Sequence, residues 1–475
     1  MKGMGAMKPF DRPNILILYT DQQRTDTLGC YGQQAVPTPN IDALAQSGMR
    51  FERCFVQNPV CAPSRASFLT GRYCSALHIG TNGIVFPRGE YALPRLLKPY
   101  GYETAQLGKL HFDPHARRDH RDPTDTYGFD TFVLSDEPGC YDDAYTKWVE
   151  MVCPEQLDRV RTMLPPAAVM WGKKGYSETP RNTHEPYVFE GDAALTHTAF
   201  VTAQTCQYLK TYDRKRPFFA IAGYYAPHTP LNPPQEYLDR VDRSKLRLPI
   251  VSEEETVAPF LKDVSQEKWI DIAAAYLAMV AQVDDGVGEI VRTLKEQGLY
   301  ENTIVIFTSD HGEYLGDHGR IQKGMPGHDC ITNVPCVISY PAALQGGRVS
   351  DALVEAVDIV PTLLDLCGIQ TPSFVQGRSL VGLLRGQTDS HRDSVLTEFF
   401  DGYENRQTTV RTQTHKYFLH ENGSELLYDL QRDPHELHNV AGDLQYADVL
   451  GKMRMIMLRR IQTAACHGLP RSDEY

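Results

Sequence analysis

Short apolar runs alternate with helical patterns along most of the chain. Runs rich in Ile, Val, Phe and Tyr predict buried strands at residues 14–20, 102–107, 218–225, 303–309 and 335–340. Residues 38–48 predict a short helix with a proline near its start and a glycine at its end, and residues 272–297 keep apolar side chains at helical spacing. This alternation is typical of an α/β protein whose large, mainly parallel sheet is flanked by helices.

The pattern changes near the C-terminus. Residues 408–412, 416–420 and 425–430 predict an antiparallel meander that includes an Asn-Gly hairpin turn. Residues 447–464 predict a closing helix. The C-terminal part is therefore expected to form a smaller antiparallel sheet plus a helix.

These two patterns predict two domains. The larger N-terminal domain covers residues 1–385 and the smaller α+β subdomain covers residues 386–475. Within the first domain, residues 112–192 form a polar stretch with scattered aromatics and a weak periodic pattern. We interpret this stretch as insertions that line the mouth of the functional site.

Composition narrows the class of partner. The formal net charge of −12, from 48 basic and 60 acidic residues, argues against nucleic acid or an anionic membrane as the main partner. The 11 cysteines lack the spacing of a disulfide scaffold or a zinc site, so we expect most of them to be reduced core residues. Residues 15–18 are too short an apolar run to span a bilayer, and no signal peptide is visible. We expect a cytoplasmic protein, with a periplasmic or secreted location as the alternative if a leader was removed.

Polar residues of a particular kind follow four of the predicted strands. They are Asp21-Gln22, Lys109 with His111, His228, and Asp310-His311. A single aspartate after a strand is more often a helix cap, and a single histidine is more often a packed core residue. Because ligands bind beyond the carboxyl ends of the strands in an open α/β sheet, the four sets together indicate one site for a metal and an anion.

The residues Cys61-Ala62-Pro63-Ser64-Arg65 stand at the predicted start of a helix. A lone cysteine usually behaves as a small buried hydrophobe. A thiol followed by a proline and an arginine at these offsets is, however, the signal by which sulfatases have their cysteine oxidised to formylglycine. The local context therefore favours a reactive Cys61 over a packed one.

With these motifs, the chain resembles the formylglycine-dependent sulfatases of the alkaline phosphatase superfamily. The resemblance runs from NILILYTDQQRTDTLGCYG through CAPSRASFLTGRY, LGKLHF, APHTPLNPP and FTSDHGEYLGDHGRIQKG to ELLYDLQRDPHELHNVA. It implies an alkaline-phosphatase-like fold with the catalytic domain at residues 1–385. It also implies hydrolysis of sulfate monoesters, with a sulfated sugar or another small polar alcohol sulfate as substrate.

The resemblance implies a nucleophile and its helpers. Cys61, oxidised and hydrated, presents a geminal diol whose one hydroxyl attacks sulfur while the other later expels sulfate. Arg65, four residues further along the helix, pairs with the formylglycine oxygens and the metal ligands. His111 handles the proton of the second hydroxyl. A formylglycine-generating enzyme is the implied maturation partner.

Three further residues act on the sulfate ester in this family. The resemblance implies that Lys109 and Lys323 clamp the sulfate and that His228 protonates the leaving alcohol. Lys323 as a solvated loop lysine, and His228 as a residue that merely caps a rigid turn, are the structural alternatives.

The implied metal ligands are Asp21, Gln22, Asp310 and His311. Many family members open with two aspartates, and others place an asparagine where this chain has His311. We expect a divalent cation, calcium, because most of the donors are oxygens. Manganese is the competitor because an imidazole joins the set.

Two other functions stay open at this point. The Asp-Gln and Asp-His pairs are similar to those of phosphonate monoester hydrolases, so a phosphonate or phosphodiester hydrolase on the same nucleophile is the alternative enzyme. The third possibility is a noncatalytic binder of sulfated glycans in which Cys61 stays a thiol. Lys109 with His111 favours a sulfate monoester, and the proton donor His228 argues against a binder.

Two further pairs of neighbouring ionisable residues are not part of the predicted site. Asp284-Asp285 lies within the helical pattern, and we interpret it as a polar contact near the site or a solvated face. We interpret Asp317-His318 as part of a helix or loop surface.

Overall fold

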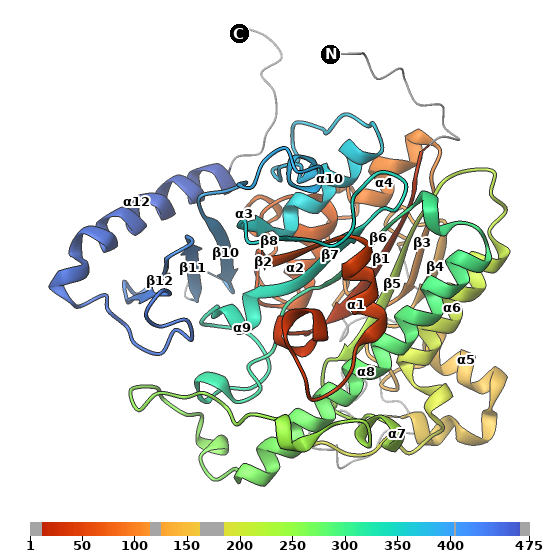
Figure 1. The fold of residues 1–475 in the computed structure, drawn as a ribbon, viewed down its shortest axis with the longest axis horizontal. Helices are drawn as coiled ribbons and strands as arrows, with labels where there is room; N and C mark the ends of the chain where they lie inside the picture. The colour runs from red at the N-terminus through yellow and green to blue at the C-terminus, as the bar shows by residue number, and fades with distance from the viewer. Residues whose placement is uncertain (1–11, 115–124, 162–184, 403–404, 466–475) are drawn as a thin grey trace, which may run out of the picture.

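The computed structural model describes residues 12–114, 125–161, 185–402 and 405–465. The chain forms a nine-stranded sheet covered by helices and a separate four-stranded antiparallel sheet (Figure 1). This architecture confirms the predicted fold class. In sheet order the large sheet contains β4 (Thr131–Leu134), β3 (Glu103–Gly108), β5 (Phe218–Pro227), β1 (Asn14–Asp21), β6 (Thr303–Ser309), β7 (Asn333–Ser339), β2 (Met49–Phe55) and β8 (Arg348–Ser350), with β9 (Val354–Glu355) also paired to β2.

The centre of the large sheet is parallel. β1 pairs in parallel with both β5 and β6, and β3 pairs in parallel with β4 and β5. β7 runs antiparallel to β6 and β2. The strands β1, β3, β5 and β6 therefore end at the same edge of the sheet, as predicted for the residues that follow them.

β1 is buried on both faces, which explains its unbroken apolar sequence. Ile15 and Ile17 belong to one core cluster, with side chains of α2 (Cys61–Thr70) and α10 (Ile359–Leu366). Leu16 and Leu18 belong to the other, with side chains of α1 (Pro39–Ser47), α6 (His197–Thr211) and α8 (Gln266–Glu296). Figure 1 shows α10 and α8 on opposite sides of the sheet.

The stretch 112–192 is more regular than its sequence suggests. It contributes β4 to the edge of the large sheet and then α5 (Ala144–Val152). Asp143 caps α5 in a reciprocal arrangement with Thr146. Residues 115–124 and 162–184 lie outside the described residues. The interpretation of the whole stretch as insertions is wrong for its described strand and helix.

The C-terminal sheet contains β10 (Val395–Phe400), β11 (Arg406–Arg411), β12 (His415–His420) and β13 (Glu425–Asp429). α12 (Ala447–Ala464) packs against it through Leu450, Met453 and Met457. Three of these strands and the helix are predicted by the sequence, and β10 is not. The boundary between residues 385 and 386 stays a prediction.

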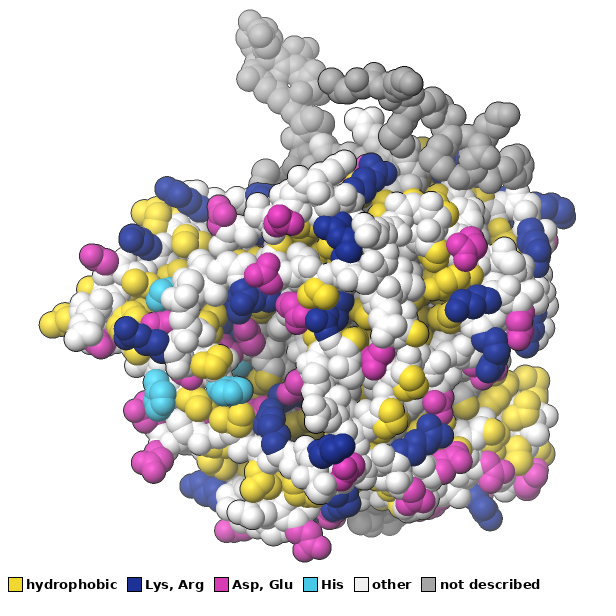
Figure 2. All heavy atoms as spheres, viewed as in Figure 1, with side chains coloured by type: hydrophobic (Ala, Val, Ile, Leu, Met, Phe, Trp, Pro, Cys, Tyr) yellow, Lys and Arg dark blue, Asp and Glu magenta, His cyan; other side chains and the backbone are white. Residues whose placement is uncertain are grey.

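The distribution of surface charges and the state of the cysteines both bear on expectations from the sequence. Figure 2 shows acidic and basic side chains interspersed on one face of the molecule. Every cysteine within the described ranges has a free thiol. No helix among the described residues is both long and apolar enough to cross a membrane.

Candidate active site

Cys61, the predicted nucleophile, lies at the first turn of α2. Its Sγ is 2.8 Å from Lys323 Nζ, 3.2 Å from His311 Nε2 and 3.7 Å from Asp21 Oδ1. Cys61 is 1% exposed. The fold thus brings the cysteine motif to the edge where β1 and β6 end.

The surroundings of Cys61 favour negative charge on its side chain. Burial and the Asp21 carboxylate would raise the pKa of the thiol. Lys323, Lys109 and His311 more than offset both, so the pKa of Cys61 lies below its usual value. Among these cations, Lys323 makes the shortest contact with Cys61 Sγ. A group at this position is therefore stabilised as an anion.

Arg65 and Lys109 hold the two site aspartates. Arg65 Nε donates to Asp310 Oδ2 at 2.7 Å, and its Nη2 donates to Asp21 Oδ2 at 3.2 Å. Lys109 Nζ lies 2.6 Å from the same Asp21 oxygen. Burial raises the cost of ionising Asp21, but Lys109, Arg65 and Lys323 hold the pKa of Asp21 well below its usual value. The Oδ2 atoms of Asp21 and Asp310 thus pair with Arg65 and, for Asp21, also with Lys109.

The remaining carboxylate oxygens converge with His311. Asp21 Oδ1 and Asp310 Oδ1 lie 3.8 and 3.7 Å from His311 Nε2. His311 Nδ1 donates to the Gly312 carbonyl at 2.8 Å, because that oxygen can only accept, which leaves Nε2 as the ring nitrogen that faces these carboxylates. Donors that share one calcium ion at its usual bond lengths lie roughly 3 to 4 Å apart. Together with Cys61, the side chains of Asp21, Asp310 and His311 form a buried cluster that offers ligand atoms for a metal ion.

His228 and Lys323 form a pair beside the cysteine. Lys323 Nζ donates to His228 Nε2 at 2.7 Å, and His228 Nδ1 donates to the Thr229 carbonyl at 2.6 Å. Burial and then the Lys323 ammonium hold the pKa of His228 well below its usual value. The imidazole of His228 is therefore neutral, and the proton shared between Lys323 Nζ and His228 Nε2 belongs to Lys323.

Family models match nearly the whole chain. The model described as "Sulfatase" matches residues 13–369, and the model described as "N-sulphoglucosamine sulphohydrolase, C-terminal" matches residues 316–463. The chain belongs to the sulfatase family. The predicted family is confirmed, and its motifs coincide with the cluster around Cys61.

Individual relatives cover both hydrolase chemistries considered above. The chain is 29% identical to an arylsulfatase of Clostridium perfringens over 95% of both chains. It is 28% identical to an N-acetylglucosamine-6-O-sulfatase of Bacteroides thetaiotaomicron, covering 92% of this chain and 84% of the relative. The crystal structure of a phosphonate monoester hydrolase of Agrobacterium radiobacter superposes with a TM-score of 0.79 at 28% identity, covering 95% of this chain and 96% of that one.

One residue of this sulfatase's site, Glu313, has no role assigned from the sequence. The Gln22 side-chain amide donates to Glu313, and the Glu313 carboxylate also accepts from the backbone N–H groups of Leu315 and Gln322. Burial raises the pKa of Glu313, but its ionised carboxylate can only accept and the Lys323 ammonium can only donate, so both partners turn the NH₂ of Gln22 toward Glu313. Its Oε1 then faces Lys323 Nζ at 3.0 Å. Glu313 lies within the DHGE motif, but its role depends on the buried contact with Gln22, which is distant in the sequence. The sequence alone therefore does not predict this role.

His111 lies two residues beyond Lys109 and is buried. Its backbone N–H donates to Asp136 Oδ1 at 2.8 Å, and its φ of 59° is in the left-handed region. These contacts fix the turn that follows β3. The role of His111 in proton transfer stays a prediction.

The pairs Asp284-Asp285 and Asp317-His318 lie outside the cluster around Cys61. Asp284 is buried and accepts from the Ile41 backbone N–H at 2.8 Å, which caps the start of α1. Asp317 is also buried and pairs with Arg24 at 2.9 Å, while the ring of His318 stacks on another imidazole. The interpretation of Asp317-His318 as a surface is therefore wrong, because both side chains are packed inside the loop that follows β6.

Proposed function

We propose that this sulfatase hydrolyses sulfate monoesters with Cys61, oxidised to formylglycine, as the nucleophile. The observation that carries the proposal is the position of Cys61 Sγ between Lys323, His311 and Asp21. The sulfur stands in for a hydroxyl oxygen of the hydrated aldehyde. The same cations that lower the thiol's pKa would favour an ionised hydroxyl there.

The reaction takes two steps. In the first, the nucleophilic oxygen forms a bond to sulfur while the bond between sulfur and the ester oxygen breaks, and the alcohol leaves with a proton. In the second, the other hydroxyl of Cys61 loses its proton and becomes the aldehyde carbonyl while the carbon–oxygen bond to sulfate breaks. Water then hydrates the aldehyde again. His111 is proposed to accept the proton in the second step.

Asp21, Gln22, Asp310 and His311 would hold the divalent cation. We propose calcium, with manganese as the alternative because of the imidazole donor. When bound, the cation supplies positive charge that lowers the pKa of the diol and polarises the sulfate oxygens. Arg65 keeps the two aspartates oriented with their Oδ1 atoms toward His311.

Lys323 and His228 would serve the sulfate and its leaving group. Lys109 and Lys323 supply positive charge near Cys61, as a sulfate clamp requires. When the anionic sulfate ester pairs with Lys323, it neutralises the ammonium that lowers the pKa of His228. The negative charge of the ester also favours the protonated form of His228. His228 can then donate a proton to the departing alcohol oxygen.

The relatives support an organic sulfate as substrate. A sulfated sugar is the proposed class, because one relative is an N-acetylglucosamine-6-O-sulfatase. A formylglycine-generating enzyme is the proposed maturation partner, and the cytoplasm is the proposed location. A phosphonate monoester or phosphodiester hydrolase remains the second candidate, because the phosphonate hydrolase of Agrobacterium radiobacter shares the fold at 28% identity.

An activity panel tests the proposal. The purified protein, matured with a formylglycine-generating enzyme, would be assayed with an aryl sulfate, a sugar sulfate, a phosphate monoester, a phosphodiester and a phosphonate monoester. We expect the highest kcat/KM with a sulfate ester. A higher kcat/KM for a phosphonate than for every sulfate would favour the second candidate, and no turnover of any ester would favour a noncatalytic binder.

A further inference from the structure

The reaction centre can be reached from one side. Of the ten predicted site residues, only His228 and Lys323 are partly exposed, and the other eight are buried. An ester bound at Cys61 must therefore direct its alcohol past these two side chains. The surface next to them is where the alcohol would lie.

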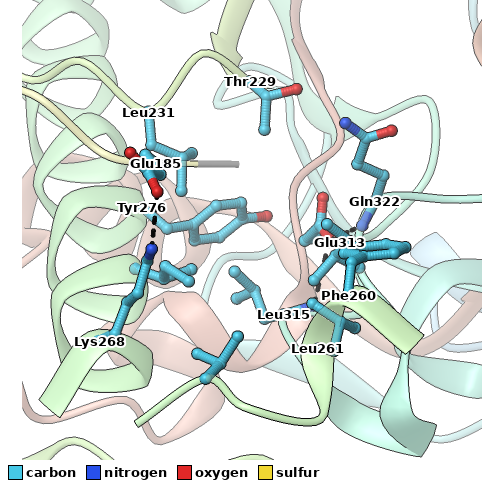
Figure 3. A pocket seen from close by; sticks show the side chains of 13 residues that line it. Glu185, Thr229, Leu231, Phe260, Leu261, Lys268, Tyr276, Glu313, Leu315 and Gln322 are labelled. Carbon is cyan, nitrogen blue, oxygen red and sulfur yellow. Dashed lines mark hydrogen bonds and ion pairs between the residues drawn. The ribbon is translucent and has the colours of Figure 1, made fainter. Parts of the chain in front are cut away.

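A cavity of about 300 Å³ lies beside this surface. Figure 3 shows the side chains that line it. Thr229, which follows His228, and Gln322, which precedes Lys323, both line it. The rest of the wall is largely apolar. It includes Leu231, Phe260, Leu261, Ile272, Leu315 and Ile321.

The polar atoms in the inner wall are already used by the protein. The Tyr276 hydroxyl donates to the Gln22 carbonyl, and Glu313 accepts from Gln22 and two backbone N–H groups. At the rim, Lys268 pairs with Glu185 at 2.8 Å. A hydroxyl-rich group placed deep in this cavity would lose its hydrogen bonds to water with little replacement, which disfavours its binding.

We propose that this cavity, the apolar pocket, binds an aryl or alkyl portion of the alcohol that carries the sulfate. The proposal rests on the proposed sulfatase function and assigns the site amphipathic sulfate esters in preference to a fully hydroxylated sugar sulfate. Thr229 and Gln322 face the polar end of such a substrate next to the reaction centre, and the apolar side chains surround the remainder. An apolar cavity of about 150 Å³ holds a benzene molecule, so the pocket has room for a larger aryl group or a medium alkyl chain.

Binding of alkanesulfonates to the Cys61→Ala protein tests the proposal without turnover. A sulfonate carries the anionic head group but has no ester bond to break. From ethanesulfonate to octanesulfonate, we expect Kd to fall about fourfold for each added methylene until the pocket is full, because each buried methylene contributes a constant free energy. A Kd that does not depend on chain length would overturn the proposal.

Two substitutions locate the effect. Phe260→Ala and Ile321→Asn should flatten the dependence on chain length and leave the Kd of ethanesulfonate within about twofold. Phe260 is 61% exposed, so its removal should not disturb folding, and Tyr91→Ala, at a 55% exposed aromatic outside the pocket, is the matched control. An unchanged slope in both pocket variants would place the alkyl chain elsewhere and refute the assignment.

Turnover by the unsubstituted protein separates this inference from the proposed function. Alkyl sulfates from propyl to octyl have leaving groups of nearly equal reactivity, so kcat/KM should rise with chain length in parallel with binding. Turnover of sulfate esters without any dependence on chain length would remove the pocket assignment and keep the sulfatase. Chain-length-dependent sulfonate binding without turnover of any sulfate ester would keep the pocket and remove the reaction.

Discussion

Each aspartate at the reaction centre divides its two oxygens between different tasks. Asp21 and Asp310 turn one oxygen toward Arg65 and the other toward His311. Because these side chains are almost completely buried, the arrangement costs desolvation that only close, well-oriented partners can offset. Asp21 and Asp310, the proposed cation ligands, are thus oriented by Arg65.

The side chain of Gln22 is also oriented by a buried charged partner, the carboxylate of Glu313. In a Glu313→Gln protein, the new side-chain oxygen can still accept from the Leu315 and Gln322 N–H groups, and its NH₂ then faces Gln22. Gln22 must turn its oxygen toward that NH₂ and away from Lys323 and the proposed cation site. We expect the Kd for calcium or manganese, measured by calorimetry, to rise about 10- to 100-fold.

The exchanged pair is the control for this prediction. In Gln22→Glu/Glu313→Gln, the new carboxylate accepts from the new amide with one oxygen and faces the cation with the other. Cation affinity should return to the original level or exceed it. Unchanged affinity in the single Glu313→Gln variant would show that Glu313 does not set the orientation of Gln22.

The neutral state of His228 gives a prediction about leaving groups. A good leaving group departs without a proton, whereas an alkyl or sugar alcohol needs one. His228→Ala should therefore slow hydrolysis of an alkyl or sugar sulfate by about 10² to 10⁴-fold and slow nitrophenyl sulfate far less. The comparison requires kcat/KM for both substrates in both proteins. Equal losses would show that His228 positions the sulfate and does not protonate the alcohol.

At the scale of elements, the loop that carries Lys323 is tied to the C-terminal sheet. The loop leads into α9 (Asp329–Thr332), and Asp329 pairs with Arg411 at 3.1 Å and with Lys416 at 2.7 Å. Lys416 also pairs with Glu436 at 2.8 Å. Although burial opposes ionisation, Lys416 and Arg411 lower the pKa of Asp329 to about 2. The smaller sheet therefore helps to fix one wall of the active site.

Removing the ammonium of Lys416, which Asp329 and Glu436 share, should lower the free energy of unfolding. Lys416→Met leaves Glu436 buried without its cation and leaves Asp329 with Arg411 alone. We expect the free energy of unfolding, measured by urea denaturation, to fall by about 3 to 5 kcal/mol. Lys452→Met, at an exposed position of α12, is the matched control and should change it by less than about 0.5 kcal/mol. A loss no larger than that of the control would mean that the buried pairs do not stabilise the junction.

The sequence predicts the central strands and the site better than the edges. β1, β5 and β6 are apolar throughout because helices cover both faces, so their ends and the residues beyond them are visible in the sequence. β2 (MRFERCF) has partly exposed charged residues near the edge of the sheet, and β4 is only half-buried, so neither has a clear strand pattern. The contact of Glu313 with Gln22 joins residues that are far apart in the sequence. It depends on tertiary packing, so local sequence patterns do not predict it.

Across the whole molecule, one buried histidine should make stability depend on pH. His197 packs between Tyr145 and Phe200 on the face covered by α8, and burial lowers the pKa of His197 to about 3. The folded-state pKa is below that of the unfolded chain, so the unfolded chain binds more protons as the pH falls from about 6.5 toward 3. The contribution of His197 is present above that range and is lost as the pH falls through it.

The size of this effect follows from linkage. Between about pH 7.5 and pH 5, His197 should remove about 2 kcal/mol from the free energy of unfolding. His197→Gln cannot take up this proton, so its stability should depend less on pH by that amount. Urea denaturation of both proteins at the two pH values gives the difference, and because the other ionisable groups are shared, it isolates His197. Equal pH dependence in the two proteins would contradict the prediction.

The state of Cys61 decides the proposed chemistry most directly. Protein produced with different amounts of a formylglycine-generating enzyme would be digested, and mass spectrometry would give the fraction of the Cys61 peptide that is lighter by about 18 Da, the difference between a thiol and an aldehyde side chain. Each preparation would also be assayed for sulfate release. We expect kcat to rise in proportion to the modified fraction and to be lost in Cys61→Ala. Full sulfate release by protein whose Cys61 remains an unmodified thiol would contradict the mechanism.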